Sequence, residues 1–259
     1  LQNTLKQDKE QFTVPKSVQD AIPIRRIWPD GVFQFGSKFS KCIRFSDINY
    51  AIASKEDKTA MFLNYSELLN ALDTGSTTKI TINNKRLNRQ NFEETILLPP
   101  RGDFLDEYNA MLTDKVTDSS NSVVQERYIT VSTHKKNVDE ARTFFDRVIG
   151  DVTSRLNKLD SHSEELDAIE RLRILHDFYR VGEETEFHFN LKDSMRKGAS
   201  YKDAICPDSM EFKKDHFVMG DKFGRVLFLK EYASYIKDSM INELTELNRT
   251  LMLSIDVIL

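Results

Sequence analysis

The stretch 210–258 constrains the fold most, because it predicts strand, tight turn, strand, helix and strand in direct succession. Gly220 and Asp221 separate two apolar-rich runs, 212–219 and 223–229. A Gly-Asp pair at that place predicts a β-hairpin, because both residues tolerate positive φ. The second run ends in Val-Leu-Phe-Leu at 226–229, which does not alternate and therefore predicts a strand covered on both faces.

The same stretch continues with a helix and a third strand. Asp238 is placed to cap a helix whose apolar residues recur at helical spacing, namely Met240, Ile241, Leu244 and Leu247. Residues 251–257 then alternate between apolar and polar, which predicts a strand with one strongly apolar face. A chain that stops directly after such a strand, and that begins at Leu1 without an initiating Met, is expected to be cut from a longer protein.

The order strand, strand, helix, strand is predicted a second time near the N-terminus. Residues 33–35 and 39–45 flank a Gly36-Ser37 turn and predict a hairpin. A capping box at Ser54 and Asp57 precedes a helix with the apolar stripe Met61, Phe62, Tyr65, Leu68, Leu69 and Leu72, and 79–82 predict the next strand. The similarity of 39–45 to 223–229 suggests a duplicated module, which predicts the same strand order in both copies.

Between these modules the sequence predicts further helices and strands. A helix marked by Leu105, Tyr108 and Leu112 follows a break at 99–102, and 123–133 form a long β-rich run. Asn137 and Glu140 cap the helix with the longest apolar stripe, which comprises Ala141, Phe144, Phe145, Val148, Val152, Leu156 and Leu159. Strands and helices interleave with several hairpins, so the predicted fold class is α+β, with mostly antiparallel sheets packed under helices.

Three regions are predicted along the chain. Residues 1–30 are a polar lead, which is mobile or a short frayed helix as far as about Ser17, and a Pro-rich segment in which Pro15, Pro23 and Pro29 predict an extended path over 22–30. Residues 31–160 form a first α/β subdomain, and 161–259 form a helical connector and the second ββαβ subdomain. The polar run 160–165 is the predicted boundary, followed by a helix over 169–179 that ends at Gly182 and a short strand at Phe187 and Phe189.

Composition limits the classes of function. The chain has 259 residues with 17 Phe and 8 Tyr, which is enough for a real core. The net charge of −4 gives no general attraction to nucleic acid or to an anionic bilayer. Cys42 and Cys206 lie far apart among apolar neighbours, which favours free buried thiols in a reducing compartment. No apolar run is long enough to span a membrane, and the polar N-terminus does not have the pattern of a signal peptide.

Residue chemistry predicts no catalytic, cofactor-binding or metal site. No Gly is followed by Lys-Ser or Lys-Thr, so a phosphate-binding loop is not present. The candidates for zinc are spread over forty positions without metal-ligand spacing: His176, His188, Cys206 and His216. His162 lies beside Asp160 and Ser163, but the members of a catalytic triad normally converge from distant segments.

Two surfaces are candidates for binding. In 22–28 the only Trp follows an Arg pair, which makes Ile24, Arg25, Arg26 and Trp28 a candidate partner interface. The alternative is that Trp28 fills the edge of the core while the arginines remain in water. Basic clusters at 85–89, 134–136 and 195–197 leave contact with nucleic acid as a second possibility.

Several strings resemble one protein family. They are ERLRILHDFYR at 170–180, ICPDS at 205–209 followed by FKK, MGDK and LKEYASY, and the shorter YAIAS at 50–54, ITINN at 80–84 and LMLSID at 251–256. Over about 15–258 the sequence resembles those of the conjugal-transfer ATPases of the VirB/TrbE type that mobile elements of Gram-positive bacteria carry.

The resemblance implies the N-terminal domain that precedes a RecA-like motor in that family. ATP and Mg²⁺ are then expected only in the motor, so the full-length protein would be an ATPase while this stretch is not an enzyme and receives no catalytic residue. The implied role is docking and assembly on the cytoplasmic, inner face of the cell membrane. The implied partners are inner-membrane proteins of the type IV secretion channel, the chain's own motor domain and further copies in a homo-oligomer. A nucleic-acid-binding module of a DNA-transfer apparatus is the alternative.

Overall fold

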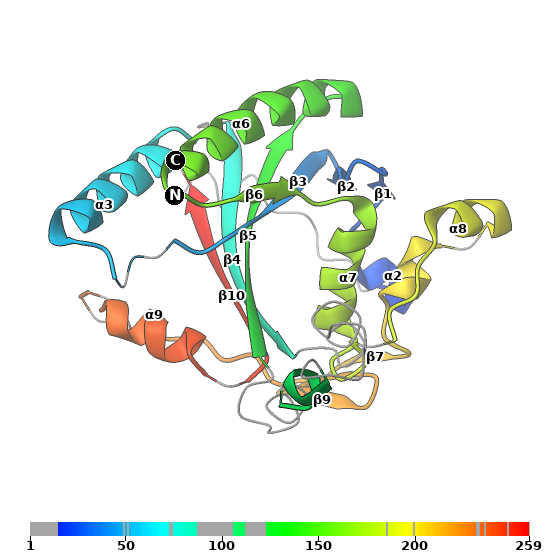
Figure 1. The fold of residues 1–259 in the computed structure, drawn as a ribbon. Helices are drawn as coiled ribbons and strands as arrows, with labels where there is room; N and C mark the ends of the chain where they lie inside the picture. The colour runs from blue at the N-terminus through cyan, green and yellow to red at the C-terminus, as the bar shows by residue number, and fades with distance from the viewer. Residues whose placement is uncertain are drawn as a thin grey trace.

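The computed structural model describes residues 15–48, 50, 52–72, 75–86, 106–111, 123–184, 186–198, 200–231, 234–235, 237–247 and 249–258. A large antiparallel sheet has helices on both faces, and a small three-stranded sheet lies at its lower end (Figure 1). The α+β fold class is therefore confirmed.

The large sheet contains segments from both ends of the chain. Its strands are, in spatial order, β1 (Arg26–Ile27), β2 (Phe33–Phe35), β3 (Lys38–Phe45), β5 (Val123–His134), β4 (Ser76–Arg86) and β10 (Leu251–Ile258). A seventh strand, β6 (Ser163–Glu165), also pairs with β3. The predicted regions 31–160 and 161–259 thus share one sheet, and β6 lies inside the predicted boundary 160–165.

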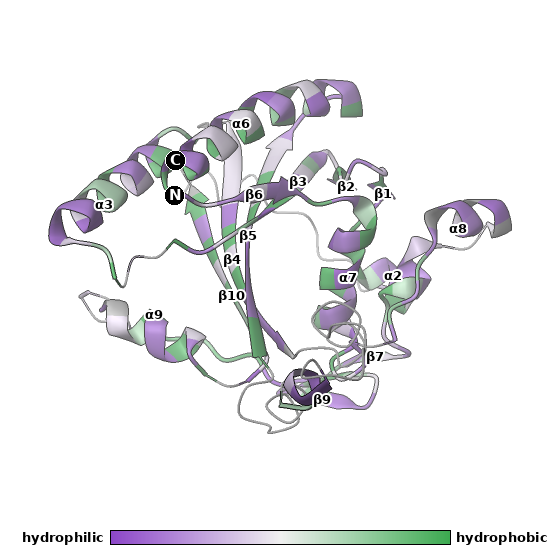
Figure 2. Cartoon of the chain, in the orientation of Figure 1, coloured by the Kyte–Doolittle hydropathy of each residue, from purple (hydrophilic) through white to green (hydrophobic). Residues whose placement is uncertain are grey.

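The first face of the sheet carries the main core. The helices α3 (Lys55–Asn70) and α6 (Val138–Lys158) cover it (Figure 1). The Asn137 side chain accepts the Glu140 backbone N–H at 2.8 Å, as predicted, and the predicted stripe of α6 is buried. In Figure 2 the turns of α6 change between hydrophobic and hydrophilic, as expected for a helix with one apolar side.

One cross-strand row shows how the three central strands meet in this core. Ile43 of β3 lies opposite Ile129 of β5, and Ile129 lies opposite Ile80 of β4. All three are buried, with exposed fractions of 1%, 3% and 8%. The strand β5 therefore fills the space between β3 and β4 and supplies the apolar side chain that the other two need.

The second face is covered by α7 (Ala168–Tyr179). Ile174 of α7 packs against a small cluster that contains Cys42 and Tyr128 of the sheet. A second core cluster joins Leu172 of α7 to short segments that include α2 (Val18–Ala21) and η1 (Tyr201–Ala204). The helix α8 (Leu191–Lys197) lies further out (Figure 1).

The predicted C-terminal hairpin is present, but it is shorter than expected. The strands β7 (Met210–Phe212), β8 (Phe217–Met219) and β9 (Lys222–Gly224) form the small sheet, and Gly220 turns at φ +58°. The prediction that 226–229 are a strand covered on both faces is wrong, because these residues belong to neither described sheet and are exposed. Their apolar character reflects a surface rather than a core, since no described strand lies beside them to pair with.

Other predictions differ in detail. Phe187 and Phe189 form no strand, although they pack against the second core. Asp238 is the first residue of α9 (Asp238–Thr245) rather than its cap, and Lys237 at the cap makes no side-chain hydrogen bond. Within the predicted stripe of α3, Leu68 and Leu72 are buried, whereas Phe62 and Tyr65 are exposed.

Several predictions fall outside the described residues. They concern the polar lead as far as residue 14, the break at 99–102, Leu105 and Leu112, and 87–89 of the first basic cluster. The residues 106–111, which the structure does describe, are helical.

The repeated element order is confirmed, but the duplication hypothesis fails its prediction of the same strand order in both copies. The element order strand, strand, helix, strand occurs near both ends of the chain. However, β3 and β4 share one sheet through β5, whereas β9 and β10 lie in different sheets. The predicted strand order therefore holds for the hairpins but not for the third strand.

Candidate functional site

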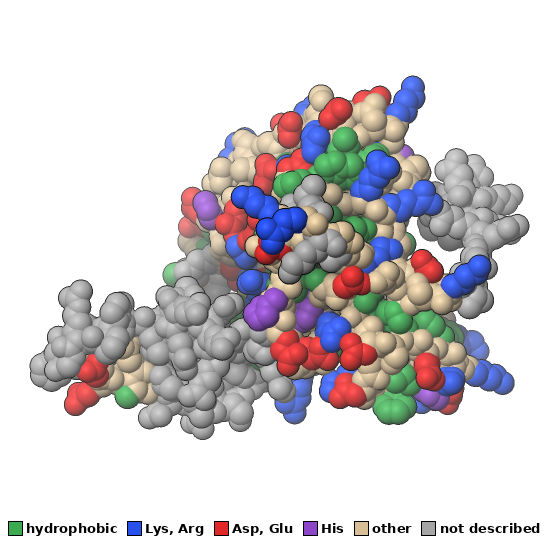
Figure 3. All heavy atoms as spheres, turned by 90° about the vertical axis from the view of Figure 1, so that its right-hand side faces the viewer, with side chains coloured by type: hydrophobic (Ala, Val, Ile, Leu, Met, Phe, Trp, Pro, Cys, Tyr) green, Lys and Arg blue, Asp and Glu red, His purple; other side chains and the backbone are tan. Residues whose placement is uncertain are grey.

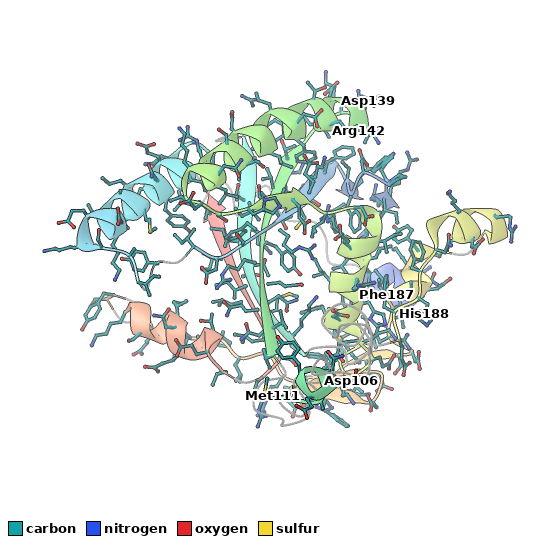
Figure 4. The ribbon with its side chains drawn as sticks, in the orientation of Figure 1. Asp106, Met111, Asp139, Arg142, Phe187 and His188 are labelled. Atoms are coloured by element: carbon teal, nitrogen blue, oxygen red, sulfur yellow. The ribbon has the colours of Figure 1, made fainter. Side chains whose placement is uncertain are left out.

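The residues considered for metal or catalysis do not converge. The described part of the chain contains no group of three or more His, Cys, Asp or Glu that could hold a metal ion. His176 is buried with its ring 5.2 Å from that of Phe187, while His188 and His216 lie on other segments. Figure 4 labels Phe187 and His188 on the segment beside α7.

Both cysteines are free and buried, as predicted. Burial raises the pKa of the Cys42 thiol and of the Cys206 thiol, so each is held as the unreactive neutral form. Thr130 donates its hydroxyl hydrogen to the Cys42 sulfur at 3.3 Å. The two thiols belong to different core clusters, which gives them packing roles.

The segment 24–28 has a mixed position. Ile24 is only 2% exposed in the second core, and the Trp28 ring packs 6.0 Å from that of Phe39 against the first. Arg25 and Arg26 are exposed at the short edge strand β1. Ile24 and Trp28 thus have packing roles, with Trp28 partly buried, and the two arginines are the most accessible residues of this candidate interface.

The three basic clusters lie apart from one another. The register of β4 and β5 places Lys85 at one end of the sheet and His134 at the other, a separation of roughly 35 Å at strand spacing. The third cluster lies on α8. Figure 3 shows that acidic and basic side chains are interspersed on the side that carries α7 and α8. The described clusters therefore form no continuous basic path.

The most unusual surface lies after β9. Five large apolar side chains are exposed there, and we call them the apolar run: Phe223 at 80%, Val226 at 79%, Leu227 at 84%, Phe228 at 84% and Leu229 at 66%. Monomeric proteins rarely expose contiguous apolar patches of more than a few hundred Å². Each of the two Phe side chains brings about 150–250 Å² of apolar surface to the apolar run.

An open cavity of about 500 Å³ borders the start of the apolar run. It lies between the end of α7, the β8–β9 hairpin and the first residues of β10. Its walls are mainly apolar and include Phe178, Val181, Phe217, Phe223 and Met252. A second cavity, of about 330 Å³, shares Phe178, Tyr179 and Met252 with the first and reaches Arg171.

Two arginines, Arg171 in α7 and Arg180 directly after it, donate hydrogen bonds to backbone carbonyl oxygens of other segments. Arg171 is buried and donates to the carbonyl oxygens of Gly31 at 2.6 Å and Ser40 at 2.8 Å. Burial lowers its pKa to about 10, so the guanidinium stays charged at neutral pH. Arg180, at the end of α7, donates to the carbonyl oxygen of Cys206 at 2.6 Å, just before β7. Arg171 thus holds the β2–β3 hairpin against α7, and Arg180 holds the segment that precedes β7.

A charged network lies on the second face at the opposite end of β3 from its hairpin. Burial acts to raise the pKa of Glu126, but hydrogen bonds from Lys85 and Tyr128 outweigh it, so the net pKa of Glu126 is lowered. The same carboxylate lies 3.8 Å from Arg44, which also pairs with Glu164 and Glu170. Every group of this network has a partner of opposite charge or a hydrogen bond, which fits a structural role. Elsewhere, Arg142 of α6 forms two ion pairs at the surface, one with Asp30 and one with Asp139. Figure 4 labels Arg142 and Asp139.

Sequence reasoning missed the functional meaning of the apolar run. The signal was present, since Val-Leu-Phe-Leu lacks alternation, but a surface segment and a doubly covered strand have the same pattern. The outer edge of β10 was missed as well. In the described structure β10 pairs only with β4, and Ile255 on its apolar face is 43% exposed.

No model of a known protein family matches the chain, and no curated protein is significantly similar to it. Among the described residues, no helix combines the length and the apolar character needed to cross a membrane.

Proposed function

We propose that this chain is a non-catalytic docking and assembly domain of a conjugative type IV secretion ATPase. The apolar run carries the proposal, because it places five exposed apolar side chains within residues 223–229 of a chain that has two well-packed cores. A second protein surface can cover such a patch, and large patches of this kind mark interaction sites. The identity of the apparatus rests on the family resemblance of the strings at 170–180 and 205–209 and of the shorter ones beside them.

The composition of this surface suits an interaction centre. It contains Phe and Leu side chains, which make a large apolar contact, and charged residues lie within it at Arg225 and directly after it at Lys230. The β8–β9 hairpin holds the first residue of the apolar run in place, because Phe223 pairs with Val218. A partner therefore meets apolar side chains that follow directly on an ordered hairpin.

The partners in this proposal are inner-membrane proteins of the secretion channel, and the domain acts at the cytoplasmic face of the membrane. ATP turnover belongs to a motor domain, with ATP and Mg²⁺ bound there. Further copies assemble with the help of this domain into a homo-oligomer.

Co-purification after co-expression with inner-membrane channel proteins tests the proposal. The unmodified chain is expected to retain a channel protein, and the double variant Leu227→Ser, Phe228→Ser is expected to lose at least about tenfold of it, since two central apolar contacts are removed. Ile52→Ser is the matched control, because Ile52 is 81% exposed but lies outside the apolar run.

Two results would contradict the proposal. One is equal retention by the double variant and the control. The other is thermal stabilisation of the chain by Mg²⁺ and ATP, which ligand linkage requires of any domain that binds the nucleotide itself.

The nucleic-acid alternative receives less support from the geometry. Binding along a phosphate backbone needs several cations on one path, and the described basic clusters lie at separate places. Lys85 is paired with Glu126 at 2.8 Å, and Lys135 lies over the ring of Phe144.

A further inference from the structure

The chain contains two similar units, which we call the first unit (β2, β3, α3 and β4) and the second unit (β8, β9, α9 and β10). Their hairpins correspond residue by residue. Phe33, Gly36, Lys38 and Phe39 recur at the same spacing as Phe217, Gly220, Lys222 and Phe223. The pairing is also the same, since Phe33 lies opposite Ser40, and Phe217 lies opposite Gly224. Gly36 and Gly220 both turn with positive φ, at +61° and +58°. The likeness is therefore one of backbone register as well as of sequence.

The correspondence extends to the segments before the hairpins. The strings Ser-Val-Gln-Asp-Ala-Ile at 17–22 and Ser-Tyr-Lys-Asp-Ala-Ile at 200–205 each form a short helical turn with the Ser side chain as cap. The two segments pack against each other, since Lys202 Nζ donates to the carbonyl oxygens of Gln19 and Ile22, both at 2.8 Å. Ile22 and Ile205 are buried in the same cluster.

The two units differ after the hairpin. In the first unit, β3 continues to Phe45 and pairs with β5, which in turn pairs with β4. In the second unit, the residues after Gly224 pair with no described strand, and β10 pairs only with β4. By position, Leu227 corresponds to the buried Ile43, yet it is 84% exposed.

The strand β10 corresponds to β4 in the same way. The sequence Ile-Thr-Ile-Asn at 80–83 matches Leu-Ser-Ile-Asp at 253–256 in its alternation of apolar and polar residues. The apolar residues of β10 face the same side of the sheet as Ile80 and Ile82. The carbonyl oxygen of Thr245 in α9 accepts from Asn84 on that side, so α9 lies on this face as α3 does. The second unit thus has every element of the first except its middle strand.

We propose that the outer edge of β10 and residues 225–229 together form a site, the strand slot, that receives one extended strand from a partner protein. That strand runs antiparallel to both neighbours, as β5 does between β3 and β4. Its alternate residues are apolar, and one of them lies between Leu227 and Leu253, where Ile129 lies between Ile43 and Ile80 in the first unit. Carboxylates near its ends suit the flanking Arg225 and Lys230.

The outer edge of β10 supports this occupant. Soluble proteins protect sheet edges with short strands, Pro, Lys or bulges. The opposite edge of the sheet follows this rule, because β1 has two residues and contains Arg26. The strand β10 has eight residues with no Pro or Lys among them and Asp256 as its only charged residue. Within the described residues its outer edge pairs with no strand, so that edge is open to strand addition.

A second copy of the chain explains the surface less well. Pairing of β10 with β10 of another copy would satisfy the strand edge, but it would leave the apolar run uncovered. A single strand in the strand slot would pair with β10 and contact the apolar run at the same time. The inference rests on the proposed docking function for its biological meaning, and it names the kind of partner segment that the domain takes.

A fused strand tests the inference. The full chain is extended after Leu259 by a flexible Gly/Ser linker and a copy of residues 123–134, which is the strand that fills the equivalent space in the first unit. The linker gives the copy a high effective concentration. We expect the amides of 226–229 and the outward amides of β10 to exchange at least about tenfold more slowly than in the unextended chain.

Two controls accompany the fusion. A copy with the same composition in scrambled order is expected to give no protection, because it lacks the alternation. Leu227→Asp in the fused chain is expected to abolish the protection, whereas Ile52→Asp leaves it intact. The inference is overturned if the authentic copy protects no better than the scrambled one, or if the unextended chain forms a dimer in sedimentation that Leu227→Asp dissociates.

The results separate this inference from the proposed function. Protection by the fused strand without binding of channel proteins would keep the strand slot and reject the proposed function. Binding of channel proteins through the apolar run without protection by the fused strand would do the reverse.

Discussion

The hairpin β2–β3 and the hairpin β8–β9 have the same register and the same turn, but their surroundings differ. The continuation of the first, with Ile43, lies in the centre of a sheet beside β5. The continuation of the second, with Leu227, lies on the surface. The comparison shows that an apolar strand sequence indicates side chains that need to be buried. Whether they are buried depends on the neighbouring elements of the fold.

The largest expected difference between the two units concerns their equivalent apolar residues. Ile43→Ala is expected to cost about 2–5 kcal/mol of unfolding free energy, because it opens a cavity in the row with Ile129 and Ile80. Leu227→Ala is expected to cost less than about 0.5 kcal/mol, as is usual for an exposed side chain. Urea unfolding of the two variants measures both values. Equal costs would show that Leu227 is buried in solution.

The next largest expected difference in unfolding free energy concerns Arg171 and Arg180. Arg171→Met is expected to cost about 2–3 kcal/mol, because it leaves the carbonyl oxygens of Gly31 and Ser40 without their buried donor. Arg180→Met is expected to cost about 1 kcal/mol, because its side chain is 21% exposed and water can reach the Cys206 carbonyl oxygen. Thermal unfolding ranks them, and a larger loss for Arg180→Met would reverse the comparison.

The turn glycines should behave alike. Gly36→Ala and Gly220→Ala each place an L side chain at positive φ with no heavy atom within 4 Å of the new Cβ. Each is therefore expected to cost about 1 kcal/mol, which is the conformational penalty alone. A difference of more than about 1 kcal/mol between them in chemical denaturation would mean that the second hairpin unfolds separately from the first.

The smallest effect is the acid sensitivity of the first unit. The pKa of Glu126 is lowered in the folded chain below its ordinary 4.5, so its contribution is fully present above about pH 4.5 and is lost as the pH falls through the folded value. Glu126→Gln is expected to flatten the fall of stability with pH in that range. Denaturant titrations at several pH values below 5 check this, with Glu243→Gln on the exposed side of α9 as control.

Local patterns predicted the elements well. The Asn137 cap, the stripe of α6, the long strand β5 and the two Gly turns follow from periodicity and turn chemistry, and the structure contains them all. Each depends on residues close in sequence. The free thiols were predicted for the same reason, since Cys42 and Cys206 both lie in apolar runs.

The long-range relations could not be predicted in the same way. The pattern of 226–229 is the same for a strand that is covered by its neighbours and for one that is not, so the sequence predicts a buried strand where the structure has an exposed segment. The pairing of β10 with β4 joins segments far apart in the chain and depends on the whole sheet. Arg171 also appeared as an ordinary helix residue, although its guanidinium reaches Gly31 and Ser40.

Amide hydrogen exchange of the unextended chain tests the central claim most directly, because it compares the equivalent segments in one sample. We predict strong protection of 41–45 in β3 and exchange of 225–229 close to the rate of an unstructured peptide. Comparable protection of the two segments would contradict the claim that the second unit presents an uncovered strand for a partner.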